Sequence, residues 1–191
     1  MEGSQIRQNR RNEESTGEAL NYSKSKAGEN FQFPLTQSDM RKKLRVYLDT
    51  SVISSLFDKR NPERRSLTES FFFGMRDFEP YISEITVAEI QKTPDSALRQ
   101  KMIEVIPLFS IISLSDEVED LTKKYIYQGA VPKEYREDAY HIAIATLNEM
   151  DYLLSWNFKH IVRRKTRDIV RMVNSLNNLK SIEIMTPAEL L

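Results

Sequence analysis

Short apolar runs of strand-like composition alternate along most of this chain with longer segments that have helical periodicity. Apolar and β-branched residues predict strands at 44–48, 79–83, 110–114, 152–155 and 182–185. Helices are predicted at 50–58, at 63–78, from Thr86 to before Pro94, from the N-cap candidate Asp95, from Asp116 to near Gly129, and at 132–150. This alternation is typical of an α/β fold in which helices connect the strands of a parallel sheet.

Residues 1–40 follow neither a helical nor a strand period. They are rich in Ser, Asn, Gln, Glu and Arg, so we predict a disordered or non-native N-terminal tail. The composition changes at Met40, and one hypothesis is that translation starts there; the alternative is an authentic tail that docks on a partner. We expect residues 41–191 to form one folded domain.

Composition narrows the function classes. The chain has 191 residues and no Cys, which excludes a disulfide scaffold, a thiolate metal site and a cysteine nucleophile. It has no apolar run long enough to span a bilayer and no signal-peptide core, so we expect a cytoplasmic protein without membrane contact. The 28 basic and 28 acidic residues balance, which argues against a strongly basic nucleic-acid binder but is compatible with local basic stripes.

Two aspartates lie next to segments that we predict to be buried, one at the end of a strand and one on a helix. Asp49 directly follows the first predicted strand, where it serves either as a helix N-cap or as a functional ligand. Asp138 shares one face of a nearly all-apolar helix with His141. A carboxylate entering the core must be paired or metal-bound, so the alternative for Asp138 is a salt bridge, for instance to Arg136.

Further polar positions follow the second and fourth strands. Glu89 lies one turn into a helix and is preferred to Glu84 because apolar residues surround it, although a surface pair with Lys92 is the ordinary alternative. Ser155 and Asn157 follow the fourth strand. The carboxylates named so far, together with oxygen atoms of Ser51, Ser155 and Asn157, form an all-oxygen environment that suits Mg²⁺ or Mn²⁺.

The segment 41–191 resembles a PIN-domain ribonuclease of the VapC toxin type. The motifs that carry the resemblance are VYLDTSVISSLF, ISEITVAEI, EDAYHIAIA, DYLLSWNFKHI and the closing IEIMTPAEL. The resemblance implies a Rossmann-like three-layer α/β/α fold with a mostly parallel sheet of about five strands. It also implies hydrolysis of RNA phosphodiester bonds, with an antitoxin protein and a second copy of the chain as partners.

The resemblance implies that Asp49, Glu89 and Asp138 are the metal ligands and that Asn157 is the fourth residue of the catalytic set. Ser51 and Ser155 are expected to orient ligands or waters. Related proteins often carry a carboxylate where this chain has Asn157, and the loss of that charge weakens the case for two metals. The alternative is a catalytically impaired RNA-binding or scaffolding module.

The metal would activate a water for in-line attack on the phosphate, a scheme that needs no separate general base. His141 is then interpreted as a hydrogen-bonded core residue. A basic stripe beside the site is expected to bind RNA phosphates, although each residue can also be a solvated helix position. The residues of the stripe that we expect to bind RNA are Lys159, Arg163, Arg164 and Arg167.

Two further interpretations remain open from the sequence. The phenylalanines at 57, 71–73 and 78 either belong to one core or provide a surface for a partner. A DNA-directed nuclease or a phosphatase-like enzyme is disfavoured, because the first strand ends in Asp-Thr-Ser rather than Asp-x-Asp and the chain has five Gly and no phosphate loop.

Overall fold

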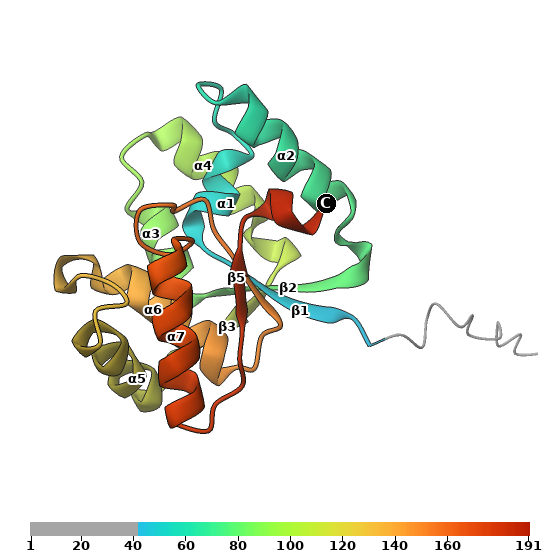
Figure 1. The fold of residues 1–191 in the computed structure, drawn as a ribbon. Helices are drawn as coiled ribbons and strands as arrows, with labels where there is room; N and C mark the ends of the chain where they lie inside the picture. The colour runs from blue at the N-terminus through green and yellow to red at the C-terminus, as the bar shows by residue number, and fades with distance from the viewer. Residues whose placement is uncertain (1–41) are drawn as a thin grey trace, which may run out of the picture. The chain divides into compact units, whose positions relative to one another are not determined.

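The structure is a computed structural model that describes residues 42–191, in which a five-stranded parallel sheet forms the centre (Figure 1). The expectations for residues 1–40, the tail and the start at Met40, lie outside these residues. The strands are β1 (Leu44–Leu48), β2 (Phe78–Ser83), β3 (Ser110–Ile112), β4 (Tyr152–Leu154) and β5 (Glu183–Met185). Their order is β3-β2-β1-β4-β5, and every neighbouring pair is parallel. The predicted α/β architecture is confirmed.

Both faces of the sheet are covered, which explains why its strands are apolar at consecutive positions. Successive side chains of a strand point to opposite faces. In β1, Tyr47 belongs to one buried cluster, whereas Val46 and Leu48 belong to the other. In β4, Leu153 and Leu154 divide in the same way. The sheet therefore separates two hydrophobic cores, as expected of three layers.

Helices connect the strands and supply the two outer layers. Those of the first layer are α1 (Thr50–Ser55), α2 (Pro62–Phe73) and α4 (Ser96–Val105), with α3 (Glu84–Gln91) at the edge of both cores. Those of the second are α5 (Asp116–Tyr127), α6 (Arg136–Leu147) and α7 (Arg164–Leu176). Short 3-10 helices are η1 (Met75–Asp77), η2 (Ile106–Leu108), η3 (Lys133–Tyr135) and η4 (Pro187–Leu190).

Side-chain caps mark the starts of α1, α3 and α4, and several predicted helix bounds are wrong. The helix predicted at 132–150 begins at Arg136, after the 3-10 turn η3. The helix predicted at 63–78 ends at Phe73, because β2 begins at Phe78, and the helix predicted at 50–58 ends at Ser55.

Asp95 caps α4 as expected, accepting hydrogen bonds from the backbone amides of residues 97 and 98. The helix predicted from Thr86 begins at Glu84 instead. Ser83 is its N-cap, and Thr86 completes a reciprocal capping arrangement inside the first turn.

The phenylalanines between α1 and β2 belong mainly to one core. Phe71 is buried, and Phe57, Phe72 and Phe78 pack against the same cluster. Phe73 is the exception, because it is 92% exposed. The core interpretation therefore accounts for most of this aromatic segment.

Among residues 42–191, no helix combines the length and the apolar character that crossing a lipid bilayer requires.

Candidate functional site

The strand order reverses direction between β1 and β4, and the candidate site lies at the carboxyl ends of these two strands. From β1 the chain adds β2 and β3 on one side, and β4 and β5 are added on the other. Clefts of parallel α/β sheets form at such a reversal. Asp49 follows β1, Ser155 follows β4, and the Ser155 hydroxyl donates a 2.5 Å hydrogen bond to Asp49 Oδ2.

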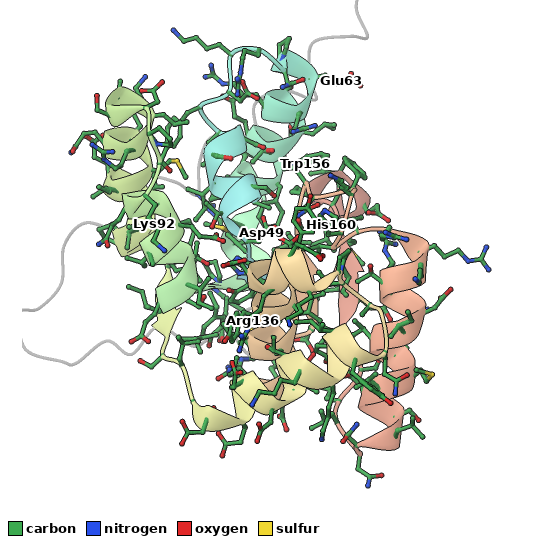
Figure 2. The ribbon with its side chains drawn as sticks, turned by 90° about the vertical axis from the view of Figure 1, so that its left-hand side faces the viewer. Asp49, Glu63, Lys92, Arg136, Trp156 and His160 are labelled. Atoms are coloured by element: carbon green, nitrogen blue, oxygen red, sulfur yellow. The ribbon has the colours of Figure 1, made fainter. Side chains whose placement is uncertain are left out.

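Asp49 is at once a helix cap and a buried member of the site (labelled in Figure 2). Its Oδ1 accepts hydrogen bonds from the backbone amides of Ser51 and Val52 and from the Ser51 hydroxyl. Burial raises the pKa of the Asp49 carboxyl, and His141 and the hydroxyls of Ser155 and Ser51 partly offset that rise. The capping and ligand interpretations of Asp49 are therefore compatible.

Glu89 reaches the site from α3 through two polar partners. Its Oε2 accepts a hydrogen bond from the Thr50 hydroxyl and lies 3.2 Å from His141 Nε2. Burial opposes ionisation, but the bond to His141 and the charges around it lower the pKa of Glu89 below its usual value. Glu84, the competing residue, is exposed and accepts from the backbone amide of Leu114.

His141 joins the site to a buried polar chain. Its Nδ1 lies 2.7 Å from Tyr47 Oη, which in turn lies 2.7 Å from Ser83 Oγ. Burial opposes a charged imidazole, yet Tyr47, Glu89 and Asp49 together raise the pKa of His141 well above its usual value. The expected core histidine is thus hydrogen-bonded in the core and also in contact with the acidic site.

Asp138 is paired with an amide and not with a cation. Asn157 Nδ2 donates a 3.0 Å hydrogen bond to Asp138 Oδ1. The alternative partner Arg136 is engaged elsewhere, in an ion pair with Glu119. Burial raises the pKa of Asp138 to about 6, and the negative charges of Asp49 and Glu89 contribute to that rise.

The three carboxylates fit a divalent cation by chemistry. Asp49, Glu89 and Asp138 come from three separate elements and interact through their charges. Hydroxyl and amide oxygens surround them, and a hard cation prefers oxygen ligands. Within residues 42–191, however, no three His, Cys, Asp or Glu side chains already converge as a ready metal cluster. The chemical fit to a cation therefore rests on the negative charge and the oxygen donors of the site, and not on a preformed cage.

The four basic residues expected to bind RNA take part mainly in local contacts. Arg167 forms a forked interaction with Glu189 at 3.3 Å, and Arg164 lies 3.6 Å from Asp168. Lys159 donates to Tyr135 Oη, and Arg163 donates to the Lys159 carbonyl.

The groove along α7 is lined by Val162, Arg164, Arg167, Asp168 and Arg171 and has a volume of about 490 Å³. Two acidic partners, Asp168 and Glu189, therefore reduce the positive charge that the stripe presents.

The residues that hold Glu89 and His141 in place were not predicted from the sequence. Tyr47 has the strand periodicity of a core residue, and its hydroxyl contacts depend on how β1, β2 and α6 pack. Thr50 directly follows Asp49, and its position indicates only a helix cap. A tyrosine among aliphatic residues in a buried strand is the one sequence signal that could have indicated a buried polar partner.

Comparisons with known proteins give structural likeness only. No protein-family profile and no curated protein sequence matches the chain.

One similar solved structure is Mycobacterium tuberculosis VapC20, a Sarcin-Ricin loop cleaving toxin, with 10% identity, a TM-score of 0.49, and coverage of 60% of this chain and 92% of that one. Another is VapBC2 from Rickettsia felis bound to a promoter DNA fragment. It has 12% identity and a TM-score of 0.48, and the match covers 74% of this chain and 97% of that one.

The third is DNA-bound VapBC from Salmonella typhimurium. It has 14% identity and a TM-score of 0.48, and the match covers 75% of this chain and 98% of that one. All three structures contain VapC or VapBC proteins.

The raised pKa of Asp138 predicts a pH-dependent loss of stability. The native carboxyl binds its proton up to pH about 6, whereas an unfolded aspartate releases it near pH 4, so stability falls as pH rises from about 4 through 6. Asp138→Asn removes the charge and should stabilise the protein at pH 8 by roughly 1 kcal/mol after solvent screening, with a smaller gain at pH 4.

Urea denaturation in EDTA at the two pH values measures this difference. Asp77→Asn, at an exposed position in η1, is the matched control and should show no such gain. Equal stability of Asp138→Asn and the parent at pH 8 would contradict the assignment.

Tyr47→Phe removes the hydroxyl that pairs with buried His141 Nδ1 and Ser83 Oγ. We expect a loss of about 1–3 kcal/mol in the free energy of unfolding, because a buried polar group loses its partner. Tyr81→Phe removes a hydroxyl that bonds to exposed Glu79 and should have a much smaller effect. Urea denaturation compares the two variants, and an equal small loss for both would rule out the buried chain as a stabilising element.

Proposed function

We propose that this protein is a metal-dependent endoribonuclease. The observation that carries the proposal is the placement of three carboxylates, Asp49, Glu89 and Asp138, at the sheet reversal. Burial first, and then the negative charges of Asp49 and Glu89, raise the pKa of Asp138 to about 6. Such an acidic centre repels a phosphate unless a cation neutralises it. The donor chemistry suits Mg²⁺ or Mn²⁺, and the residues that would hold it are Asp49, Glu89 and Asp138.

When bound, the cation would supply a nucleophilic water and neutralise charge that develops on the phosphate. The chain's own residues prepare the site for it. Ser51 and Ser155 orient the two Asp49 oxygens, and Asn157 orients Asp138. His141 and Thr50 hold one Glu89 oxygen, so each carboxylate has its rotamer fixed before substrate arrives.

A specific observation favours one alternative, an impaired RNA-binding or scaffolding module. Asn157 places an amide donor against Asp138, where related motifs place a further carboxylate. Three charged ligands remain instead of four. In this alternative, RNA binds at the site but is not cleaved.

The toxin role and the partners are a further part of the proposal. They rest on the resemblance of the sequence motifs to VapC-type toxins and include an antitoxin protein, a homodimer and a cytoplasmic location. RNA is the proposed substrate, and VapC20, one of the similar structures, is a toxin that cleaves the Sarcin-Ricin loop.

Cleavage of a labelled single-stranded RNA panel tests the activity directly. The full chain should cut RNA with Mg²⁺ or Mn²⁺ and not with EDTA. Asp49→Asn should lower the rate at least about 100-fold, because a metal ligand loses its charge while the cap remains. Glu84→Gln, on an exposed residue of the same sheet edge, is the control and should cut at the parental rate.

Cutting that persists in EDTA or in Asp49→Asn would refute the metal scheme. Binding of the same RNA without any cutting would favour the impaired module over the enzyme.

Asn157→Asp tests the missing charge separately. The new carboxylate would face Asp138 across 3.0 Å, so the variant should be less stable than the parent in EDTA. Bound Mg²⁺ relieves that repulsion, and the rise in Tm on adding Mg²⁺ should therefore be larger in the variant than in the parent. Thermal denaturation with and without Mg²⁺ measures both effects. An equal Mg²⁺-dependent rise in both proteins would show that residue 157 lies outside the cation's reach.

A further inference from the structure

A stacked pair of rings lies beside the acidic site and takes no part in the scheme above. The ring centroids of Tyr135 and His160 are 3.8 Å apart, and the ring planes are inclined by 28°. His160 is 5% exposed, whereas Tyr135 is 40% exposed. The histidine is thus the buried layer of the stack, and the tyrosine presents its surface to solvent.

The buried ring of His160 makes no polar contact that would explain its burial. Among the described residues, neither Nδ1 nor Nε2 of His160 has a hydrogen-bond partner, and both atoms are buried. An unpartnered buried polar atom is destabilising, so an apolar ring would serve the fold better. Within the stack, the imidazole acts as a flat support for the ring of Tyr135.

Short chain segments attach this stack to the site. Tyr135 precedes α6 and is three residues before Asp138, and His160 follows Asn157 by three residues (Asp49 and His160 are labelled in Figure 2). The backbone amide of His160 donates a 3.0 Å hydrogen bond to Asn157 Oδ1, and Asn157 Nδ2 bonds to Asp138. The stack is therefore held in a fixed position relative to the carboxylates.

Positive charge lies at the edge of the exposed ring. Lys159 Nζ is 3.3 Å from Tyr135 Oη and 5.1 Å from the ring centroid. Arg163 is exposed and donates to the backbone carbonyl of Lys159. An aromatic ring with a cation beside it matches a nucleotide, because the base can stack on the ring while the phosphate meets the positive charge.

We propose that Tyr135, supported by His160 and flanked by Lys159, is a stacking subsite for one unpaired nucleobase of the RNA at the acidic site. The proposal rests on the proposed function and adds the residue that binds the base. A base paired within a duplex cannot offer its face to Tyr135, so the nucleotide bound there is single-stranded or flipped out.

RNA binding measured in an uncleaving background tests the subsite. Full-length Asp138→Asn protein is titrated with a fluorescent single-stranded RNA in Mg²⁺, with and without Tyr135→Ala. Loss of one base–aromatic stack should weaken binding about 5- to 100-fold. Tyr135→Phe should bind nearly as well as the Tyr135 protein, because stacking needs the ring. Tyr127→Ala removes a tyrosine that is 88% exposed on α5 and should leave affinity unchanged.

A set of RNAs with an abasic site at successive positions identifies the stacked nucleotide. At one position the abasic substitution and Tyr135→Ala should each weaken binding, and together they should weaken it no more than either alone. Additive losses at every position would overturn the subsite.

The two proposals fail in different ways. If the protein cleaves RNA with Mg²⁺ but Tyr135→Ala binds and cleaves as the parent does, the subsite is wrong and the nuclease stands. If no RNA is bound or cleaved by any form, both proposals fall.

His160→Ala and His160→Phe test the support of the stack. Removal of the ring should weaken RNA binding, and phenylalanine should restore it, because the support is a flat ring and not a hydrogen bond. A loss of binding that phenylalanine does not restore would overturn the supporting role of His160. Because Tyr135 is exposed, its variants keep the test valid even if His160→Ala unfolds.

Discussion

The accommodation of three acidic side chains at the reversal between β1 and β4 is the constraint on which the rest of this structure depends. Burial disfavours a charged carboxylate, and neighbouring carboxylates disfavour it further. Hydrogen-bond donors offset this cost. Two hydroxyls and two backbone amides donate to Asp49, a side-chain amide donates to Asp138, and an imidazole contacts Glu89. Much of the polar chemistry of the sheet edge follows from this requirement.

These donors do not stabilise the charged form of the three carboxylates equally. The pKa of Glu89 is lowered by its hydrogen bond to His141. Asp138 has a neutral amide as its hydrogen-bond partner, and burial raises its pKa to about 6 although the charge of His141 opposes the rise. Excess negative charge destabilises the folded site, and the proposed cation would relieve that repulsion on binding. His141 supplies part of the missing positive charge, and its own position depends on Tyr47.

The sequence predicted the sheet well because apolar runs and helix periodicity report burial directly. All five strands lie where their residues indicate, and Asp49, Ser155 and Asn157 follow strands whose carboxyl ends meet at one edge. The polar chain through Tyr47 and Ser83 was beyond prediction, since its members are 36 residues apart and meet only through parallel pairing and helix packing. The start of α3 was misplaced because Ser83 and Thr86 are both good caps, and their reciprocal bond decided between them.

Charge alone does not explain how RNA would be held. The acidic centre repels phosphate, and along α7 the guanidinium groups of Arg164, Arg167 and Arg171 each have a carboxylate partner. Exposed ion pairs contribute little to stability, but each partner reduces the local positive potential available to a phosphate. Affinity must then come in part from contacts that charge does not cancel. Stacking on an aromatic ring is such a contact, and Tyr135 offers an exposed ring held close to Asp138 and Asn157.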